Sequence, residues 1–325
     1  NDFIKSYYLF FRFFIKNIFL LDSEINFFKN KHSNTNFCFF LKDDFNSSFF
    51  GKSLIYNIMN ILTFDNLLKK IPKQDKGLYI IENQSWEYCF VKLWKKYNHG
   101  KLYAYFNSSA RFWDLRYLKP KQKPHNSDEN PHKYLINKYI LKSEIKKFGY
   151  PMERVSKTDA LRYIKLKEIK KIKKNKKILI VGDILFKETL DLIKYIDQIV
   201  DKLKIYKFYL KPHPTMTTKS INHFKNNYNY LNITNINSNN FKNFQFIICS
   251  NGTSANLDCM IMGLNFCSIK IKNSLNLFPV KKFEKKYQIK SHKDLISKIK
   301  NSKKEKNIFS KNNNLKFTNL ENFFF

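Results

Sequence analysis

Glycine and proline are scarce in this sequence, with 7 and 8 of its 325 residues respectively. That scarcity excludes a collagen-like repeat and a low-complexity chain. The five cysteines are odd in number and form no Cys-x-x-Cys pair, which argues against a disulfide framework and against a cysteine zinc site. No stretch of about 18 uncharged apolar residues occurs, so no transmembrane helix is expected.

Arginine is scarce too, although the chain is strongly basic. Lys and Arg total 60 against 26 Asp and Glu, a formal net charge of +34, yet only five of the basic residues are arginines. Proteins that grip phosphates or bases with paired hydrogen bonds favour arginine. Lys, Phe, Ile, Asn and Tyr all have AT-rich codons, so a biased genome explains the composition, which argues against nucleic acid as a partner. The charge is expected to attract anionic lipid headgroups or anionic sugar substrates.

What the chain does contain is typical of a folded protein. Apolar residues make up 43% and aromatic residues 17%. A chain of 325 residues normally forms two domains, because single cores stop growing near about 250–300 residues. The chain begins with Asn1 rather than Met, which leaves open whether preceding residues complete the first domain.

The most apolar segment is Tyr7–Leu21, which Arg12 and Lys16 interrupt. It predicts an amphipathic or core helix, with contact to a membrane surface as the alternative. The unpaired cysteines favour buried free thiols in a reducing compartment, so we expect a cytoplasmic protein, and a peripheral association with the inner face of the membrane stays open.

The first domain, 1–165, is predicted to contain a βαβ unit. Leu78–Glu82 is a short apolar run that indicates a buried strand. Ser85–Tyr97 carries apolar residues at helical spacing, with Ser85 as the expected N-cap, and Leu102–Phe106 is the next strand. Lys119–His132 contains three prolines and is expected to be a surface loop.

The second domain, 170–300, alternates strands with helices, as a doubly wound parallel sheet does. Together the two parts predict an α/β fold of two Rossmann-like domains facing a central cleft, followed by a tail at 301–325. The expected strands are Lys177–Val181, Tyr206–Leu210, Leu231–Thr234, Phe244–Cys249 and Phe266–Ile271, and the expected helices are Thr189–Leu203, Ala255–Met262 and His292–Lys300.

Three unusual loops follow strands of the second domain: Gly182-Asp183, Lys211–Pro214 and Ser250–Ser254. In open parallel sheets, ligands bind at the carboxyl ends of the strands. The three loops are therefore expected to crowd one edge, and Gly182 is a candidate phosphate-binding residue there.

The last of these loops reads Ser-Asn-Gly-Thr-Ser and precedes a predicted helix. Small residues let an anion approach the backbone, hydroxyls add donors, and the helix start adds free N–H groups. The alternative is an ordinary N-capped turn. The candidate phosphate-binding residues here are Ser250, Asn251, Gly252, Thr253 and Ser254.

In Lys211–Pro214, Pro212 and Pro214 bracket His213 and stiffen the loop directly after a strand. A fixed imidazole can donate to a phosphate or protonate a leaving phosphate. Lys211, His213 and Pro214 therefore join the candidate phosphate site, with His213 also a candidate catalytic residue. The alternative is a histidine that merely caps a strand end.

In the first domain, Glu82 closes a predicted strand and suits a general base or a nucleophile toward a sugar carbon. The other candidate acceptor-binding or sugar-binding residues are Glu87, Arg111, Trp113 and Asp114, with Trp113 as a stacking ring. The alternative is that the last three belong to a packed element with a structural Arg–Asp pair. No metal motif is evident in these loops, so no metal and no cofactor are expected.

The same residues resemble a family of bacterial surface-carbohydrate biosynthesis proteins, which look like GT-B glycosyltransferases of capsule and O-antigen assembly. The resemblance runs from about Leu78 to Pro279. It rests on Ile81–Glu87, Ser108–Tyr117, Gly149–Pro151, Ala160–Tyr163, the KPHP run and the SNGTSANLD run.

The KPHP and SNGTS pair is also similar to the HP motif and the Ser/Thr motif of bacterial sialyl-, polysialyl- and Kdo-transferases. That similarity implies that His213 and the hydroxyls of Ser250, Thr253 and Ser254 hold the phosphate of a CMP-sugar, and that Glu82 is the acidic catalytic residue. One departure is Asn107, which stands where the family has His before the RFWDLRY run.

The resemblance thus implies a glycosyltransferase of surface polysaccharide biosynthesis, whose partners are a nucleotide-sugar, CMP-linked, and a glycan acceptor. Two alternatives stay open. One is a CDP-glycerol or CDP-ribitol type polyol-phosphate transferase, and the other is a non-catalytic α/β protein that binds polyanions through its lysines.

Overall fold

The structure, a computed structural model, describes residues 2–18, 38–109, 117–119, 130–169, 174–302 and 320–323. The strands are β1 (Lys76–Ile80), β2 (Lys101–Phe106), β3 (Lys133–Asn137), β4 (Val155–Thr158), β5 (Lys177–Val181), β6 (Lys207–Lys211), β7 (Leu231–Ile233), β8 (Phe246–Ser250) and β9 (Phe266–Ile269). The α-helices are α1 (Asp2–Ile18), α3 (Cys38–Phe49), α4 (Lys52–Lys70), α5 (Ser85–Lys96), α6 (Lys142–Lys147), α7 (Phe186–Asp197), α8 (Thr218–Asn227), α9 (Ala255–Met262), α10 (Glu284–Tyr287) and α11 (His292–Lys300).

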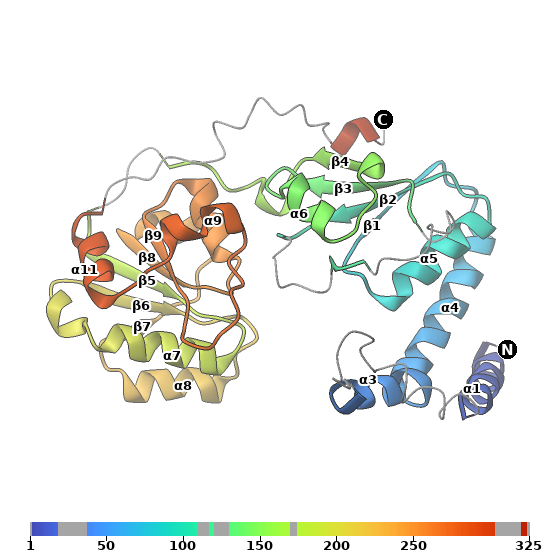
Figure 1. Cartoon of the computed structure of the whole chain (residues 1–325), viewed down its shortest axis with the longest axis horizontal. Helices are drawn as coiled ribbons and strands as arrows, with labels where there is room; N and C mark the ends of the chain where they lie inside the picture. The colour runs from blue at the N-terminus through green and yellow to red at the C-terminus, as the bar shows by residue number, and fades with distance from the viewer. Residues whose placement is uncertain are drawn as a thin grey trace. The chain divides into compact units, whose positions relative to one another are not determined.

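Two β-sheets, each accompanied by helices, confirm the predicted α/β class (Figure 1). One sheet has the strand order β1-β2-β3-β4, and the other has the order β7-β6-β5-β8-β9. The chain divides into two compact units, one of Asn1–Ala104 with Gln122–Lys133 and one of Tyr105–Lys121 with Tyr134–Phe325. Among the described helices, none is both long enough and apolar enough to cross a bilayer.

In the first unit, α1 and α3 pack against α4. Leu54, Ile58 and Leu62 of α4 are buried at helical spacing, and Leu9 and Phe10 of α1 pack against them. This small apolar cluster fixes one side of α1. The predicted helix within Tyr7–Leu21 is therefore present, although it begins earlier, at Asp2.

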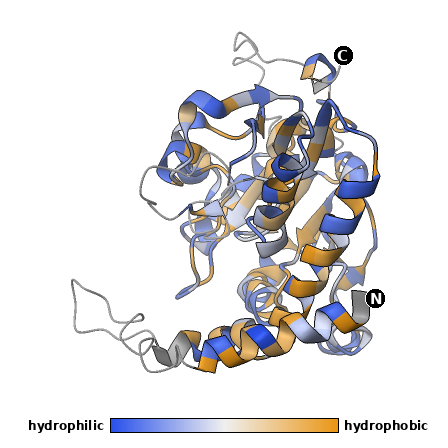
Figure 2. Cartoon of the chain, turned by 90° about the vertical axis from the view of Figure 1, so that its right-hand side faces the viewer, coloured by the Kyte–Doolittle hydropathy of each residue, from blue (hydrophilic) through white to orange (hydrophobic). Residues whose placement is uncertain are grey.

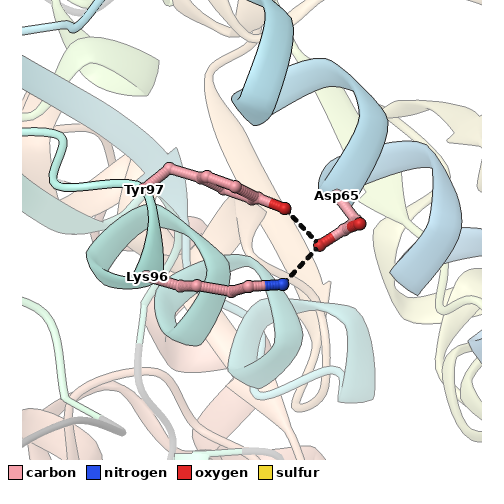
Figure 3. A network of polar contacts seen from close by, with 3 residues as sticks. All are labelled: Asp65, Lys96 and Tyr97. Atoms are coloured by element: carbon pink, nitrogen blue, oxygen red, sulfur yellow. Dashed lines mark hydrogen bonds and ion pairs between the residues drawn. The ribbon is translucent and has the colours of Figure 1, made fainter.

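Asp65 of α4 ties that helix to the end of α5 (Figure 3). Its Oδ1 accepts a hydrogen bond of 2.7 Å from the Tyr97 hydroxyl and one of 3.0 Å from the Lys96 ammonium. The bond from Tyr97, together with Lys96, lowers the pKa of Asp65. The two helices that precede and follow β1 are thus joined by a charged contact as well as by apolar packing.

The five-stranded sheet of the second unit is parallel throughout, with β5 between β6 and β8 (Figure 1). Successive side chains of β5 enter two different cores. Ile178 and Ile180 face a core shared with α7, α8 and α11, while Leu179 and Val181 face a core shared with α9. Burial on both faces explains the continuous apolar run that the sequence shows here.

Most elements of the second domain lie where the sequence predicts them: β5, α9 and α11 have the predicted bounds. The predicted helix Thr189–Leu203 is wrong in extent, because α7 begins at Phe186, ends at Asp197, and gives way to a 3-10 turn at Val200–Leu203. Among the described helices and strands, the elements additional to the prediction are α3, α4, α6, α8, α10, β3 and β4. The domain boundary near 165–170 stays a prediction, as does the tail, since residues 303–319 lie outside the described residues.

Candidate functional site

The order of the five-stranded sheet reverses between β5 and β8, since β6 and β7 lie on one side of β5 while β8 and β9 lie on the other. At such a reversal the crossing connections diverge, which leaves room for a ligand beyond the strand ends. β5 is followed there by Gly182 and Asp183, and β8 ends at Ser250. Two of the three predicted loops therefore lie beside each other at this point of the sheet.

A buried contact joins these two loops. The Ser250 hydroxyl donates a hydrogen bond of 2.7 Å to Oδ2 of Asp183, and both side chains are buried. A Cβ atom at Gly252 would lie 2.5 Å from the same carboxylate oxygen, so only glycine leaves space for it. Asp183 is not one of the predicted site residues. Its carboxylate nevertheless organises the predicted loop Ser250–Ser254.

Close packing also explains why a glycine stands at position 182. Its N–H donates to the carbonyl of Lys211 at 3.0 Å, and a Cβ there would lie 2.9 Å from the Thr189 side chain. Thr189 in turn accepts the backbone N–H of Asp183 at 2.8 Å. Gly182 thus holds β5, β6 and α7 together at the edge, and its predicted phosphate contact stays a prediction.

Asn256, in the first turn of α9, fixes the shape of the loop after β8. Its Nδ2 lies 2.8 Å from the carbonyl oxygen of Ser250, 3.0 Å from that of Thr253 and 3.4 Å from that of Asn251. The Asn251 side chain is buried and accepts the N–H of Leu277 at 2.7 Å. Ser250 and Asn251 therefore point inward in this structure, and their predicted contacts with phosphate stay predictions.

The outward part of the loop is Gly252, Thr253 and Ser254, all half-buried. Thr253 Oγ1 accepts the N–H of Ala255 at 3.3 Å, so the Thr253 hydroxyl proton is available to another group. Within the part of the chain that the structure describes, the backbone N–H groups of Gly252 and Ser254 meet no acceptor. These donors at the start of α9 have the arrangement that binds anions.

Arg162 joins this site, and the sequence analysis did not assign it. Its Nη2 donates to the Ser254 hydroxyl at 3.4 Å. Ala160, Tyr163 and Ile169 are buried in the core that contains α9, and this packing brings Arg162 to the loop. The signal was present, because Ala160–Tyr163 is one of the motifs that carry the family resemblance.

Asp258, in the first turn of α9, interacts electrostatically with Lys211. Burial lowers the pKa of Lys211, and the carboxylate of Asp258 opposes that shift. Burial also raises the pKa of Asp258, against a hydrogen bond from Ser238 and the charges of Arg162 and Lys211. Arg162 and Lys211 are thus within electrostatic reach of one carboxylate, on the helix whose start carries the free N–H groups.

The imidazole of His213 is held by its own loop. Nδ1 accepts the backbone N–H of Thr215 at 3.3 Å and lies 2.8 Å from the Thr215 hydroxyl. A nitrogen that accepts a backbone N–H carries no proton, so the neutral ring bears its proton on Nε2. Burial and the charge of Lys211 lower the pKa of His213, while Asp183 raises it. His213 is therefore a neutral Nε2–H donor within electrostatic range of Asp183, and the half-buried loop also carries the exposed Pro214.

Glu82 and Glu87 in the first unit have different surroundings. Glu82 is exposed, two residues beyond the end of β1, rather than the last residue of the strand as predicted. Glu87 is buried, and its Oε1 accepts the N–H groups of Glu82 at 2.7 Å and of Gln84 at 3.0 Å. Gln84, not Ser85, is the N-cap of α5, because Gln84 and Glu87 form a reciprocal capping box. Glu87 therefore has a structural role, and its predicted sugar contact stays a prediction.

Asn83, which directly follows Glu82, forms the turn between Glu82 and Glu87. Asn83 has a φ of +63°, in the left-handed region that asparagine tolerates better than most residues. Its Oδ1 accepts the Tyr88 hydroxyl at 3.1 Å. Burial raises the pKa of Glu87, and the backbone N–H groups that it accepts oppose the shift.

The remaining predicted residues, Arg111, Trp113 and Asp114, lie outside the described residues. Among the residues that are described, no group of three or more His, Cys, Asp or Glu side chains could hold a metal ion.

Searches of protein-family models and of curated proteins return no match for this chain. Among solved structures, the chain is similar to S. aureus MnaA with UDP, at 13% identity and a TM-score of 0.47 over 75% of this chain and 69% of that one. It is similar to the UDP-GlcNAc 2-epimerase from Neisseria meningitidis bound to UDP-GlcNAc, at 12% identity and a TM-score of 0.48 over 77% and 73%. It is also similar to the pneumococcal O-GlcNAc transferase GtfA, at 10% identity and a TM-score of 0.42 over 77% and 53%.

Proposed function

We propose that the edge between β5 and β8 binds the phosphate of a nucleotide-sugar and that the protein is a glycosyltransferase of surface polysaccharide biosynthesis. The observation that carries this proposal is convergence. Arg162 donates to Ser254, beside the free N–H groups at the start of α9, and Lys211 interacts electrostatically with Asp258 of the same helix. His213, from the same loop as Lys211, interacts electrostatically with Asp183, which accepts a hydrogen bond from Ser250. A reversal point in a parallel sheet with such donors is suited to an anionic nucleotide.

The chemistry follows from charge. As an acceptor hydroxyl oxygen bonds to the anomeric carbon, the bond from that carbon to the phosphate oxygen breaks, and the nucleotide leaves with the electron pair. The cations and N–H groups stabilise this developing negative charge. The Nε2–H of His213 donates to the leaving phosphate, and Glu82 takes the proton of the acceptor hydroxyl.

We propose a CMP-linked donor, on the basis of the similarity of the KPHP and SNGTS motifs to those of sialyl- and Kdo-transferases. A single phosphate matches a small donor set of one Arg, one Lys and one His. We propose that these side chains supply the positive charge that stabilises the leaving phosphate.

Calorimetric titration of the full chain with CMP, CDP and UDP tests the proposal. We expect CMP to bind most tightly, and Arg162→Ala to weaken it about ten- to a hundred-fold, since hydrogen bonds to charged groups contribute about 1.5–3 kcal/mol. Lys202→Ala, at an exposed lysine of the same unit, is the matched control and should bind as wild type. Failure of all three nucleotides to bind would refute the proposal.

A donor screen then separates the rival functions. Transfer of a polyol phosphate from CDP-glycerol or CDP-ribitol, in place of a sugar, would assign the protein to that class. Salt-sensitive retention on heparin or RNA, unchanged in His213→Ala, together with no turnover of any donor, would favour the polyanion-binding alternative. The proposed transferase predicts instead that His213→Ala abolishes turnover and leaves the fold intact.

A further inference from the structure

One face of α1 carries an exposed row of apolar side chains, which we name the apolar stripe: Ile4, Tyr8, Phe11, Ile15 and Ile18. Their spacing of four and three residues places them on one side of a helix. All five are exposed, Ile4 by 70% and Tyr8 by 64%. In Figure 2, α1 begins beside the label N and carries apolar residues along its length.

The apolar stripe is not the side by which α1 packs on the protein. That side carries Leu9 and Phe10, which join the α4 cluster, and Phe14, whose ring meets that of Phe50 edge-on at 5.5 Å. Asn17 is buried there and donates to the carbonyl of Phe49 at 3.0 Å. The helix is thus anchored by one face, and its apolar stripe points away from that anchor.

A row of cations borders the stripe. Lys5, Arg12 and Lys16 are seven and four residues apart, share one side of α1 and are exposed. None of the three forms an ion pair with another described residue. Lys5 has an electrostatic interaction with Asp65, whose carboxylate is already bonded to Lys96 and Tyr97. The only acidic residue of α1 is Asp2, its first residue.

We propose that α1 lies in the plane of an anionic lipid bilayer, with the apolar stripe among the acyl chains and Lys5, Arg12 and Lys16 at the headgroup phosphates. A helix with an apolar face beside a basic flank binds membrane interfaces in this way. Charge complementarity selects this occupant over a second copy of the chain, because pairing two stripes would bring two cationic rows together without acidic partners. The net charge of +34 adds long-range attraction to the same surface.

This inference does not rest on the proposed transferase activity. It concerns a face of the first unit, whereas the candidate nucleotide site belongs to the second. Nucleotide titrations of the α1 variants should match those of the wild type, so the two proposals fail independently.

Co-sedimentation of the full chain with vesicles tests the proposal. Vesicles of phosphatidylcholine mixed with phosphatidylglycerol should bind the protein, and vesicles of phosphatidylcholine alone should bind it far less. Replacing Lys5, Arg12 and Lys16 with Gln should weaken binding about a hundred-fold, since each cation near an anionic surface contributes about a five-fold factor. Replacing Phe11 and Ile15 with Ser should weaken it at least about ten-fold, by removing apolar area from the interface.

The matched control replaces Lys202, Lys225 and Lys293 with Gln. These three exposed lysines belong to the second unit, and the change in net charge is the same. Binding that survives in the control and is lost in the α1 triple variant supports the proposal. An equal loss in both variants would assign lipid binding to overall charge and overturn it. The proposal would also be overturned if the protein did not bind the anionic vesicles. It would equally be overturned if the wild type formed dimers that dissociated in the Ser variant and not in the Gln variant.

Far-UV circular dichroism and the thermal midpoint show whether the α1 variants are folded. All five substituted positions are exposed, so both measurements should match the wild type. If a Ser variant unfolds, the Gln variant alone decides the question, because it leaves the apolar packing unchanged.

Discussion

Ser250 and Asp183 meet through a hydrogen bond of 2.7 Å at the edge where the strand order of the parallel sheet reverses. The two residues are separated by 67 positions in the chain, and both side chains are buried. Gly252 completes the contact, because the Asp183 carboxylate fills the space that any larger residue there would need. The loop that we assign to the nucleotide therefore depends on a buried carboxylate beneath it.

The first prediction concerns this carboxylate and Gly252. Gly252→Ala should lower the free energy of unfolding by about 1–3 kcal/mol, because its Cβ would lie 2.5 Å from a carboxylate oxygen that Ser250 holds in place. In the background of Asp183→Ala the same substitution should have little effect, since the clashing oxygen is gone. Urea unfolding of the four proteins in this double-mutant cycle measures the coupling. Equal effects in both backgrounds would contradict the contact.

The second prediction concerns the protonation of His213. Lys211 lowers the pKa of His213 and Asp183 raises it, so Lys211→Gln should raise that pKa and Asp183→Asn should lower it. Because the pKa in the folded protein lies below the ordinary 6.5, the unfolded chain binds this proton more readily. The contribution of His213 to stability is therefore complete above pH 6.5 and is lost as the pH falls through the folded value. Titration of the imidazole signals by NMR, with His213→Gln to assign them, measures both shifts.

The third prediction separates the neighbouring glutamates. Glu87→Ala should lower the free energy of unfolding by about 1–3 kcal/mol, because it strips the acceptor from backbone N–H groups at the start of α5. Glu82→Ala should change it by no more than about 0.5 kcal/mol, since that side chain is exposed. Under the proposed function, Glu82→Gln should instead abolish turnover with an unchanged thermal midpoint. A variant at position 82 that retains wild-type turnover would remove Glu82 from the mechanism.

The fourth prediction concerns Glu144 in α6. Burial raises the pKa of Glu144 from 4.5 to about 7, although hydrogen bonds from the backbone N–H groups of Leu141 and Lys281 act to lower it. The native protein therefore keeps a proton between pH 4.5 and about 7 that the unfolded chain has released, and stability falls as the pH rises across this window. The loss is at most about 3 kcal/mol. Glu144→Gln should remove this slope in denaturant unfolding at the two ends of the window, whereas Glu153→Gln, at an exposed position, should keep it.

The strand-end loops of the site could be predicted from the sequence because apolar runs mark the strands and the carboxyl ends of parallel strands share an edge. The bond between Ser250 and Asp183 could not, since it requires β5 and β8 to be neighbours, and no local pattern reveals the order of strands in a sheet. Arg162 was missed for a similar reason. Its position depends on Tyr163 and Ile169 packing into the core that contains α9, a tertiary contact.

Local errors have local causes. The sequence Gln-Ser-Trp-Glu fits a capping box, with Gln84 as N-cap and Glu87 as the reciprocal residue, but the preference for serine at N-caps drew the prediction to Ser85. The serine instead donates to Asn57 of α4 at 2.6 Å. The helix α8, Thr218–Asn227, is hard to predict because only two of its ten residues, Ile221 and Phe224, are apolar.

The single amide of Asn256, which reaches three carbonyl oxygens of the loop after β8, has a thermodynamic consequence. Because Asn256 holds this loop in one conformation before a ligand binds, binding does not have to order a flexible segment. Entry of a nucleotide should then be fast, with a small entropic penalty and a heat dominated by the exchange of water for charged donors. Asn256 would thus influence the rate and entropy of nucleotide binding without contacting the nucleotide.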